Sequence, residues 1–423
     1  MPTPSFDLSE VLSKELVEAH FQPIVSIRKK MVIGYEGLSR GGLKGSKEHT
    51  PPQELFYQAA ESGRTLELDR LCRKKVLEGF KPIAAKHPDR FLSLNFEASV
   101  IDQGVVGSGE LMRQVKASGL DPASIALEVI ESNVKDIGDL QKFIETHRAH
   151  GFLIALDDVG AGHSNLNRIP LLKPDILKID RYLIQNIHAE FYKQEVFKSL
   201  ANLSRKIGAL TLAEGVETED EALAVMDLGA DMIQGYYFSK PHPASQGDGR
   251  GVNDKIVSMT GKYKEAVLRK MNIKQFNLKK YDVMTREVQI ELSKIKITNF
   301  DQKLREMARF FPLVECLYVL NDKGAQVTET IFGNQDEKRR NPLMFKPGTK
   351  GEDHTMKDYF YMMLDGGLRK TTFITEPYLS LATGNICITF ARLFRNVERD
   401  AIFILCADIN TEFLQKISLG LFE

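Results

Sequence analysis

The sequence has no excess of charge of either sign. Of its 423 residues, 57 are Lys or Arg and 57 are Asp or Glu, so the formal net charge is zero. This balance argues against a general nucleic-acid coat and against a polybasic membrane binder, although a local charged pocket remains compatible with it. We therefore expect neither a nucleic-acid polymer nor a membrane among its partners.

Cysteine and long apolar runs are also scarce. The four cysteines lie in apolar stretches without metal-ligand spacing, so we expect buried, reduced thiols of a cytosolic protein. No stretch approaches the roughly 20 apolar residues that a transmembrane helix requires. The N-terminal segment has no apolar run of signal-peptide length. We expect a soluble, cytoplasmic protein, and the length suggests two or three domains.

Residues 1–245 alternate short apolar runs with amphipathic helical patterns. The strand candidates are His20–Val25, Val32–Leu38, Phe91–Asn95, Ile125–Ile130, Phe152–Asp157, Asp175–Ile179, Leu210–Glu214 and Met232–Tyr236. Strands alternating with helices predict a mostly parallel sheet, and eight such units predict a barrel. Only SIRKKM separates the first two candidates, which is too short for a crossover helix and predicts an antiparallel pair. The predicted fold is α/β, a modified (β/α)8 TIM barrel with one antiparallel strand.

The pattern changes after the Gly- and Pro-rich stretch PHPASQGDGRGVND. Residues 246–310 are Lys-rich with apolar residues at helical spacing, which predicts a helical connector. Residues 311–423 predict antiparallel strands, a hairpin at NDKG and a helix over 358–368, hence an α+β domain. This layout loosely resembles the PAS or Cache families, through NDKG, the DYF run and a final strand ending in Asp408. It could hold an unknown ligand, and the alternative is a scaffold or dimerisation module without one.

Polar residues end or closely follow the predicted barrel strands. They are Glu36, Asn95, Glu128, Glu131, Asp157, Asp158, Lys178, Glu214, Glu217 and Gln234. Singly, each is better explained as a turn former, a helix cap or a solvated group. Together, five or more carboxylates at one barrel mouth would repel unless a cation lies among them. Oxygen ligands favour Mg²⁺ or Mn²⁺, and the lack of His disfavours zinc. Carboxylates with a lysine suit metal-assisted phosphodiester hydrolysis.

The ordered motifs of residues 5–245 resemble the EAL-domain family. They are QPI (22–24), E-G-L-x-R (36–40), N-x-x-x-S (95–99), E-V-I-E (128–131), D-D-V-G-A-G-x-S (157–164), K-I-D (178–180), E-G-V-E (214–217) and Q-G-Y (234–236). Each motif is short, but their order at successive strand ends is specific. The resemblance implies a cytoplasmic phosphodiesterase that binds the bacterial second messenger cyclic di-GMP and hydrolyses it to linear pGpG with one or two Mg²⁺ or Mn²⁺ ions. It also implies a homodimer.

The resemblance implies a role for each position. The metal ligands would be Glu36, Asn95, Glu128, Asp157 and the bridging Asp158. The catalytic residues would be Lys178, positioning the attacking water, Glu214, as base or second-metal ligand, and Glu217, supporting the metal-bound water. The substrate-binding residues would be Gln22, Arg40, Glu131 and Gln234. Of these, Glu131 would brace the loop after the fifth strand.

Three of the motifs depart from the family pattern. Gly37 replaces the Ala of the name motif, Ile130 replaces a Thr, and D-D-V-G-A-G replaces D-D-F-G-T-G. Because small geometric errors reduce turnover strongly, the altered loop leaves a second reading open, a cyclic di-GMP receptor with slow or no turnover. A third interpretation is an enolase-type barrel enzyme, but that interpretation does not account for Gln22, Arg40 or this motif order. No GGDEF run of a cyclase occurs in the chain.

Overall fold

Two compact units make up the chain, and they divide between Val267 and Leu268. The computed structural model describes residues 7–42, 49–97, 99, 101, 109–129, 136–161, 166–311, 314–333, 343–364, 371–399 and 401–411. None of the helices in these ranges is long and apolar enough to cross a membrane.

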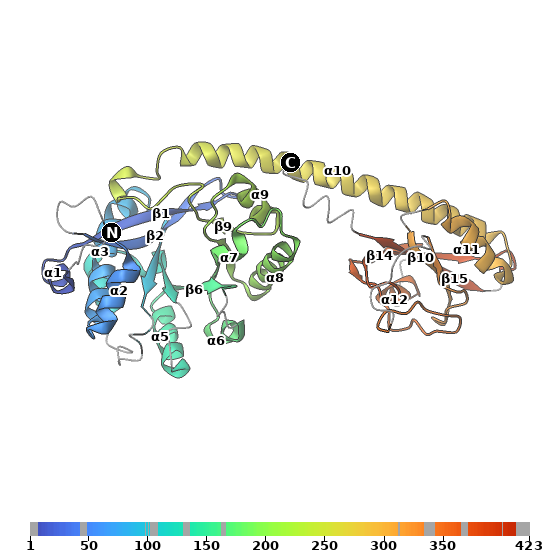
Figure 1. Cartoon of the computed structure of the whole chain (residues 1–423), viewed down its shortest axis with the longest axis horizontal. Helices are drawn as coiled ribbons and strands as arrows, with labels where there is room; N and C mark the ends of the chain where they lie inside the picture. Colours follow the sequence, from blue (N-terminus) through green and yellow to red (C-terminus); the bar gives the residue numbers. More distant parts are fainter. Residues whose placement is uncertain are drawn as a thin grey trace. The chain divides into compact units, whose positions relative to one another are not determined.

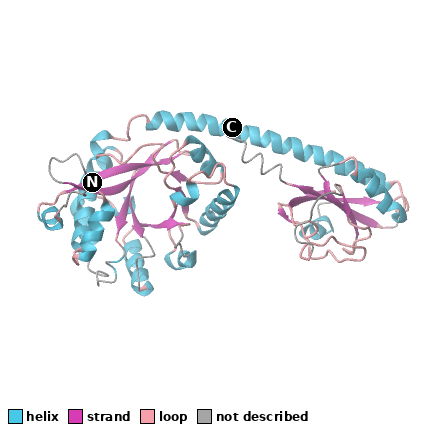
Figure 2. Ribbon diagram, in the orientation of Figure 1, coloured by secondary structure: helices cyan, strands magenta, loops and turns pink. Residues whose placement is uncertain are grey.

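The first unit is built on a closed sheet (Figures 1 and 2). Its described strands are β1 (Val17–Ser26), β2 (Met31–Gly42), β3 (His49–Thr50), β4 (Phe91–Phe96), β5 (Ile125–Val129), β6 (Leu153–Val159), β7 (Ile176–Ile179), β8 (Leu210–Ala213) and β9 (Met232–Ile233). They follow the order β1-β9-β8-β7-β6-β5-β4-β2-β3, and pairing of β1 with β2 closes the barrel. All eight predicted barrel strands are present.

Strand β1 is the reversed strand of the barrel. It runs antiparallel to β2, with Val17 opposite Gly41, and antiparallel to β9, with Val25 opposite Ile233. The pairs from β2–β4 round to β8–β9 are parallel. The predicted hairpin is therefore confirmed, because a turn of a few residues can join only antiparallel neighbours.

Helices surround the barrel and cover its outer face. The described α-helices of this unit are α1 (Leu8–Ser13), α2 (Pro52–Glu61), α3 (Thr65–Lys86), α4 (Glu110–Ser118), α5 (Ile137–Ala149), α6 (Ile169–Leu172), α7 (Arg181–Ile184), α8 (Phe191–Ile207) and α9 (Glu219–Asp227). In α3, Leu68, Val76 and Phe80 are buried, as their three- and four-residue spacing predicts. Each such side chain contributes about 1.5–3 kcal/mol by leaving water.

The second unit contains an antiparallel sheet. Its described strands are β10 (Val314–Asn321), β11 (Ile331–Phe332), β12 (Thr372–Ile374), β13 (Tyr378–Leu379), β14 (Ile386–Arg395) and β15 (Ile402–Asn410). Their order is β11-β10-β15-β14-β12, with β13 beside β14. The turn at Asn321–Gly324 joins β10 to the following segment, as predicted. After this turn the strand β11 that pairs with β10 is only two residues long, and β13 was not predicted.

The two faces of this sheet are covered differently. One face packs on α10 (Val252–Ser293) and α11 (Phe300–Ala308), through residues such as Val288, Phe300 and Phe390. The opposite face packs on α12 (Asp358–Leu364), through Tyr359 and Met363. Figure 1 shows α11 and α12 on opposite sides of the sheet.

Helix α10 contributes to both hydrophobic cores. Val252, Ile256 and Met259 belong to the core of the first unit, whereas Val288 and Leu292 belong to that of the second. The predicted helices of residues 246–310 are thus present as α10 and α11. The three-domain division at residues 245 and 310 stays a prediction.

Candidate active site

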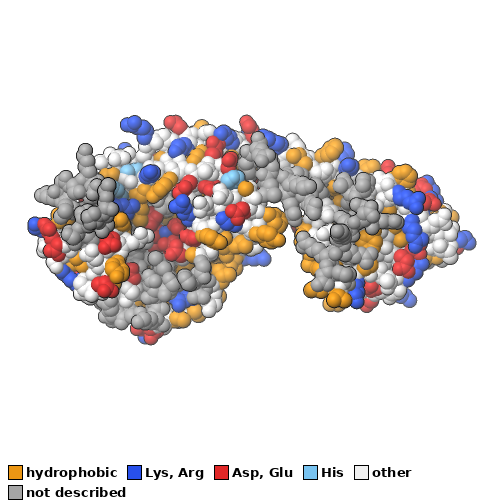
Figure 3. Space-filling view, viewed as in Figure 1, with side chains coloured by type: hydrophobic (Ala, Val, Ile, Leu, Met, Phe, Trp, Pro, Cys, Tyr) orange, Lys and Arg blue, Asp and Glu red, His pale blue; other side chains and the backbone are white. Residues whose placement is uncertain are grey.

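Along each barrel strand, a polar residue at the mouth comes two positions after an apolar residue that fills the barrel interior. The filling cluster includes Ala126, Ala155, Ile176, Leu212 and Met232. Alternate residues of a strand share a face, so the residues two positions further on also point inward. These are Glu128, Asp157, Lys178, Glu214 and Gln234. Figure 3 shows acidic side chains gathered in a hollow of this unit.

Lys178 lies among three carboxylates. Its Nζ is 2.7 Å from Glu128 Oε1, 2.7 Å from Glu214 Oε1 and 3.2 Å from Asp157 Oδ1. Glu128 and Lys178 are each only 1% exposed. One ammonium therefore holds together carboxylates from β5, β6 and the end of β8 in a site with little water.

The crowding of charge shifts the pKa values of these groups. Burial, together with the nearby Glu36 and Asp157, raises the pKa of Glu128 to about 8 despite Lys178. Burial also raises the pKa of Glu214 well above its usual range. Burial alone would lower the pKa of Lys178, but the carboxylates raise it well above its usual range. The mouth thus holds more acidic groups than one lysine can keep ionised together, and a bound cation would favour their ionised forms.

An amide network fixes Glu36 at the opposite side of the mouth. Asn95 donates from Nδ2 to Glu36 Oε1 over 3.0 Å, and Gln234 Nε2 donates to Glu36 Oε2. Gln234 also donates to Gln22 Oε1, and Gln22 donates to the carbonyl of Ser239. Both glutamines are buried, so the network orients the Glu36 carboxylate with little freedom.

The oxygen donors fit a hard divalent cation. Glu128 Oε2 and Gln234 Oε1 are buried and accept no hydrogen bond from the described residues. Asn95 is directly opposite Glu128 across β4 and β5, so neighbouring strands present both side chains together. In the described ranges no three His, Cys, Asp or Glu side chains already converge as a metal site. Instead, the Lys178 ammonium occupies the point where three carboxylates meet.

Asp158 adopts an unusual backbone conformation at the end of β6. Its φ is +55°, a region that non-glycine residues rarely occupy. Burial and the adjacent Asp157 raise the pKa of its carboxyl. Strain of this kind persists where the surrounding structure holds it, often at functional sites.

The remaining predicted residues lie at varied positions. Arg40 is half-buried on β2 and donates to the carbonyl of Ser39, and burial lowers its pKa. Glu217 is exposed and pairs with Arg181 over 2.9 Å instead of joining Lys178. Glu131 lies outside the described residues.

A buried ion pair behind the site was not predicted from the sequence. Asp69 and Arg73 of α3 are paired and almost fully buried. Asp69 Oδ1 accepts from the amide of Glu97, and the Arg73 guanidinium lies 4.8 Å from the ring centroid of Phe96. The pair therefore supports the segment that follows Asn95. The sequence pattern that could have indicated this pair is two residues of opposite charge, four positions apart, on the apolar face of a predicted helix.

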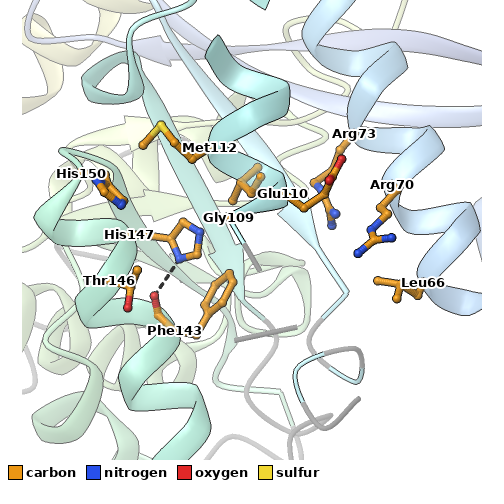
Figure 4. A pocket seen from close by; sticks show the side chains of 11 residues that line it. Leu66, Arg70, Arg73, Gly109, Glu110, Met112, Phe143, Thr146, His147 and His150 are labelled. Carbon is orange, nitrogen blue, oxygen red and sulfur yellow. Dashed lines mark hydrogen bonds between the residues drawn. The ribbon is translucent and has the colours of Figure 1, made fainter. Parts of the chain in front are cut away.

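Two cavities adjoin this ion pair. One, of about 360 Å³, lies beside the predicted metal ligands Glu36 and Asn95 and is also lined by Phe56 and Arg73. The other, of about 140 Å³, lies between α3, α4 and α5 (Figure 4). His147 stands in this second cavity, with Nδ1 2.7 Å from the carbonyl oxygen of Phe143. The second cavity contains none of the predicted site residues.

The fold and mouth define a (β/α)8-type barrel with carboxylates and a lysine at the C-terminal ends of its strands. The model of the EAL domain matches residues 6–241. This match covers more than half of the chain, so the chain belongs to the EAL-domain family. The resemblance inferred from the motifs is confirmed, whereas a PAS or Cache relationship of the second unit is not established.

The chain is similar along most of its length to YkuI of Bacillus subtilis strain 168, an uncharacterized EAL-domain protein. The two are 25% identical over 380 residues, which cover 88% of this chain and 90% of YkuI. A crystal structure of YkuI in complex with substrate c-di-GMP and calcium matches with a TM-score of 0.79, covering 96% of this chain and 99% of that one. The likeness therefore extends over both units.

Other relatives match the barrel alone. The probable cyclic di-GMP phosphodiesterase PdeN of Escherichia coli K12 is 30% identical over 253 residues, which cover 57% of this chain and 46% of PdeN. The probable cyclic di-GMP phosphodiesterase PdeB of the same strain is 27% identical over 242 residues, or 57% of this chain and 46% of PdeB. This chain thus spans about half the length of these two relatives.

Proposed function

We propose that the protein binds cyclic di-GMP and hydrolyses it to linear pGpG with Mg²⁺ or Mn²⁺. The observation that carries this proposal is Lys178 held among Glu128, Asp157 and Glu214 at the mouth of an EAL-family barrel. The complex of YkuI with substrate c-di-GMP and calcium supports the ligand and the need for a divalent cation.

The residues at the mouth would hold the cations. Glu36, Asn95, Glu128 and Asp157 would bind the first, and Asp158 would bridge to a second near Glu214. A divalent cation there would neutralise phosphate charge and lower the pKa of a bound water. The unpartnered, buried Glu128 Oε2 supports this donor set.

The chain's own groups would then position the reactants. Lys178 would donate a hydrogen bond to the attacking water, and Glu214 would accept its proton. The water oxygen would form a bond to phosphorus as one ester P–O bond breaks, and the departing sugar oxygen would take a proton from solvent water. Gln22 and Gln234 would keep Glu36 oriented while Arg40 faces a phosphate.

The outer residues have smaller assigned roles. Glu217 would support the metal-bound water, and Glu131 would brace the loop after β6. Glu217 forms an ion pair with Arg181, so the Glu217 side chain must rotate before it can contact the metal-bound water. The cavity of about 360 Å³ beside Glu36 is large enough to receive one purine base.

The test is an end-point assay with a matched control. Purified protein is incubated with cyclic di-GMP and Mg²⁺ or Mn²⁺, and nucleotides are separated chromatographically. Glu36→Gln should lower turnover at least about 100-fold, because it removes a charged ligand at the reacting centre. Glu61→Gln, at the exposed end of α2, should leave turnover unchanged. Equal turnover by folded Glu36→Gln would refute the metal assignment.

A receptor without fast turnover is the second candidate. The observation that favours it is the altered loop after β6, in which Val159 is buried and Asp158 is strained. Binding of cyclic di-GMP by isothermal titration calorimetry, with no linear product after long incubation, would support the receptor and exclude the enzyme.

We further propose that the second unit is a PAS-like sensor and that the protein is a homodimer. The sheet order β11-β10-β15-β14-β12, with one face open to a cavity, supports the sensor. Exposed Phe276, Val283 and Ile290, each seven residues apart on α10, support a dimer surface. Light scattering of the protein should give twice the monomer mass. Phe276→Lys, which places a charge on this surface, should lower the measured mass towards that of the monomer.

A further inference from the structure

The second unit contains a polar cavity on the face of the sheet opposite α10 and α11. Its volume is about 80 Å³, which admits only a small molecule. The floor comes from the central strands β10 and β15, through Cys316, Tyr318 and Asp408. The walls include His354, Tyr359 and Tyr378.

Asp408 is a buried carboxylate whose hydrogen-bond donors are neutral groups. It is 3% exposed, and it accepts hydrogen bonds from Thr389 Oγ1 at 2.7 Å and Cys316 Sγ at 3.4 Å, both neutral donors. No Lys, Arg or His nitrogen in the described ranges forms an ion pair with it. Burial, and to a smaller extent the nearby buried Glu315, raises the pKa of Asp408. A lone buried carboxylate is costly unless a positive group reaches it.

The histidine in the wall does not supply that charge. Gln326 donates from Nε2 to the carbonyl of Thr328, so its Oε1 is available to accept from His354 Nε2 at 2.9 Å. His354 Nδ1 then accepts from the hydroxyl of Tyr359, which lies 2.8 Å from that of Tyr318. Burial lowers the pKa of His354. The chain of hydrogen bonds is thus complete with a neutral imidazole.

Aromatic rings surround the acidic floor. Tyr318 and Tyr359 are buried, and the hydroxyl of Tyr378 lies 2.7 Å from Thr389 Oγ1, the donor to Asp408. Faces of tyrosine rings attract cations, and their hydroxyl oxygens can accept hydrogen bonds. Around Asp408 the cavity thus has neutral aromatic walls. Its other charged lining residues, Lys346 and Lys357 against Glu352 and Asp353, balance each other in charge. The net charge of the lining is therefore negative, which suits an ammonium group.

We propose that this cavity binds a small organic ammonium compound, with its ammonium group against the Asp408 carboxylate and its carbon atoms against Tyr318, Tyr359 and Tyr378. An anion is disfavoured, because Asp408 and Glu315 would repel it. A bare metal ion such as Mg²⁺ is disfavoured because the groups hydrogen-bonded to Asp408 are the Thr389 hydroxyl and the Cys316 thiol, which are poor ligands for a hard cation. The proposal deepens the sensor assignment by naming its ligand class, and it does not depend on hydrolysis in the barrel.

The primary test compares charged and neutral ligands on the full-length protein. Isothermal titration calorimetry is performed with methylammonium, n-propylammonium, ethanolammonium and putrescine, and with 1-propanol as the neutral counterpart of n-propylammonium. At least one ammonium compound should bind, and 1-propanol should bind at least about tenfold more weakly. Equal binding of 1-propanol and n-propylammonium, or no binding of any ammonium up to about 10 mM, would overturn the proposal.

Matched variants locate the site. Asp408→Asn keeps the size of the side chain and removes its charge, so it should weaken ammonium binding at least about tenfold. Asp322→Asn makes the same change at an exposed turn of the same unit and should bind as the wild type does. Undiminished binding by Asp408→Asn would overturn the assignment, whereas turnover of cyclic di-GMP reports on the barrel separately.

A pH series on the wild type needs no variant. The titratable and charged groups around Asp408 are Glu315, Cys316, Tyr318, Lys346, Glu352, Asp353, His354, Lys357, Tyr359, Tyr378, Cys387 and Cys406. Burial raises the pKa of Asp408 to about 6, whereas n-propylammonium stays charged up to about pH 10. Its affinity should fall as the pH drops from 8 to 5, and a constant affinity would contradict the role of Asp408.

Discussion

A Cβ atom at Gly37 would lie 2.2 Å from Cγ1 of Val76. Strand β2 and helix α3 therefore approach each other more closely than an alanine at position 37 allows. The residue pair explains why this chain has Gly in the motif that otherwise reads E-A-L. It also places Val76 directly behind the strand segment that carries Glu36.

Gly37→Ala should lower the free energy of unfolding by about 1–3 kcal/mol, because an extra methyl group overpacks the core at Val76. Val76→Ala alone should also destabilise, since it leaves a cavity. The double variant should be less destabilised than the sum of the two, with a coupling of at least about 0.5 kcal/mol, measured by urea denaturation. Additive effects would show that Val76 does not restrict position 37.

At Gly235 the backbone is again in close contact with a neighbouring segment, whereas Gly261 has open space around it and serves as the comparison. A Cβ at Gly235 would lie 1.9 Å from the carbonyl oxygen of Val216, whereas nothing lies within 4 Å at Gly261 in α10. Gly235→Ala should destabilise by about 3 kcal/mol or more, since backbone must move. Gly261→Ala should stabilise by about 0.5–1 kcal/mol, because Gly is unfavourable within a helix. Similar effects of both substitutions in thermal unfolding would refute this explanation.

Much of the barrel could be predicted from the sequence because its pattern is local. Residues such as Lys178 and Glu214 stand two positions after an apolar strand residue, and this period alone places them at the mouth. The antiparallel β1–β2 pair followed from a short connection. The second unit was harder, since β13 is only two residues long, too short to show an alternating pattern, although it pairs with Ile386 and Cys387 of the next strand.

Features that depend on tertiary packing were not predictable. The burial of the Asp69–Arg73 pair follows from how α3 meets the segment after β4, which no local pattern reveals. The direction of the Glu217 side chain depends on Arg181, a partner at the start of α7. The environment of Asp408 likewise combines residues from four strands and α12, so its isolation became visible only in the fold.

Lys178→Met should make the stability of the barrel depend on divalent cations. Without the ammonium, Glu128, Asp157 and Glu214 repel one another, so the variant should lose about 3–5 kcal/mol in the presence of a chelator. Adding Mn²⁺ should raise its melting temperature more than that of the wild type, because the cation replaces the lost charge.

Lys29→Met is the control, since it removes an exposed lysine from the β1–β2 turn. Its melting temperature should follow that of the wild type with and without Mn²⁺. If Lys178→Met responded to Mn²⁺ no more than this control, the three carboxylates would not form a cation site.

Asp408 should make the second unit less stable as the pH rises. Burial raises its pKa to about 6 in the folded protein, above the value of about 3.9 for an unfolded Asp, so the folded form binds the proton more tightly. Its unfavourable contribution is absent below about pH 4, grows between pH 4 and 6, and reaches at most about 3 kcal/mol above pH 6. Asp408→Asn should therefore match the wild type near pH 4 and exceed its free energy of unfolding at pH 7, measured by urea denaturation without added amines. Asp322→Asn should show no such divergence, and a stability difference for Asp408→Asn that stays constant from pH 4 to 7 would contradict the raised pKa.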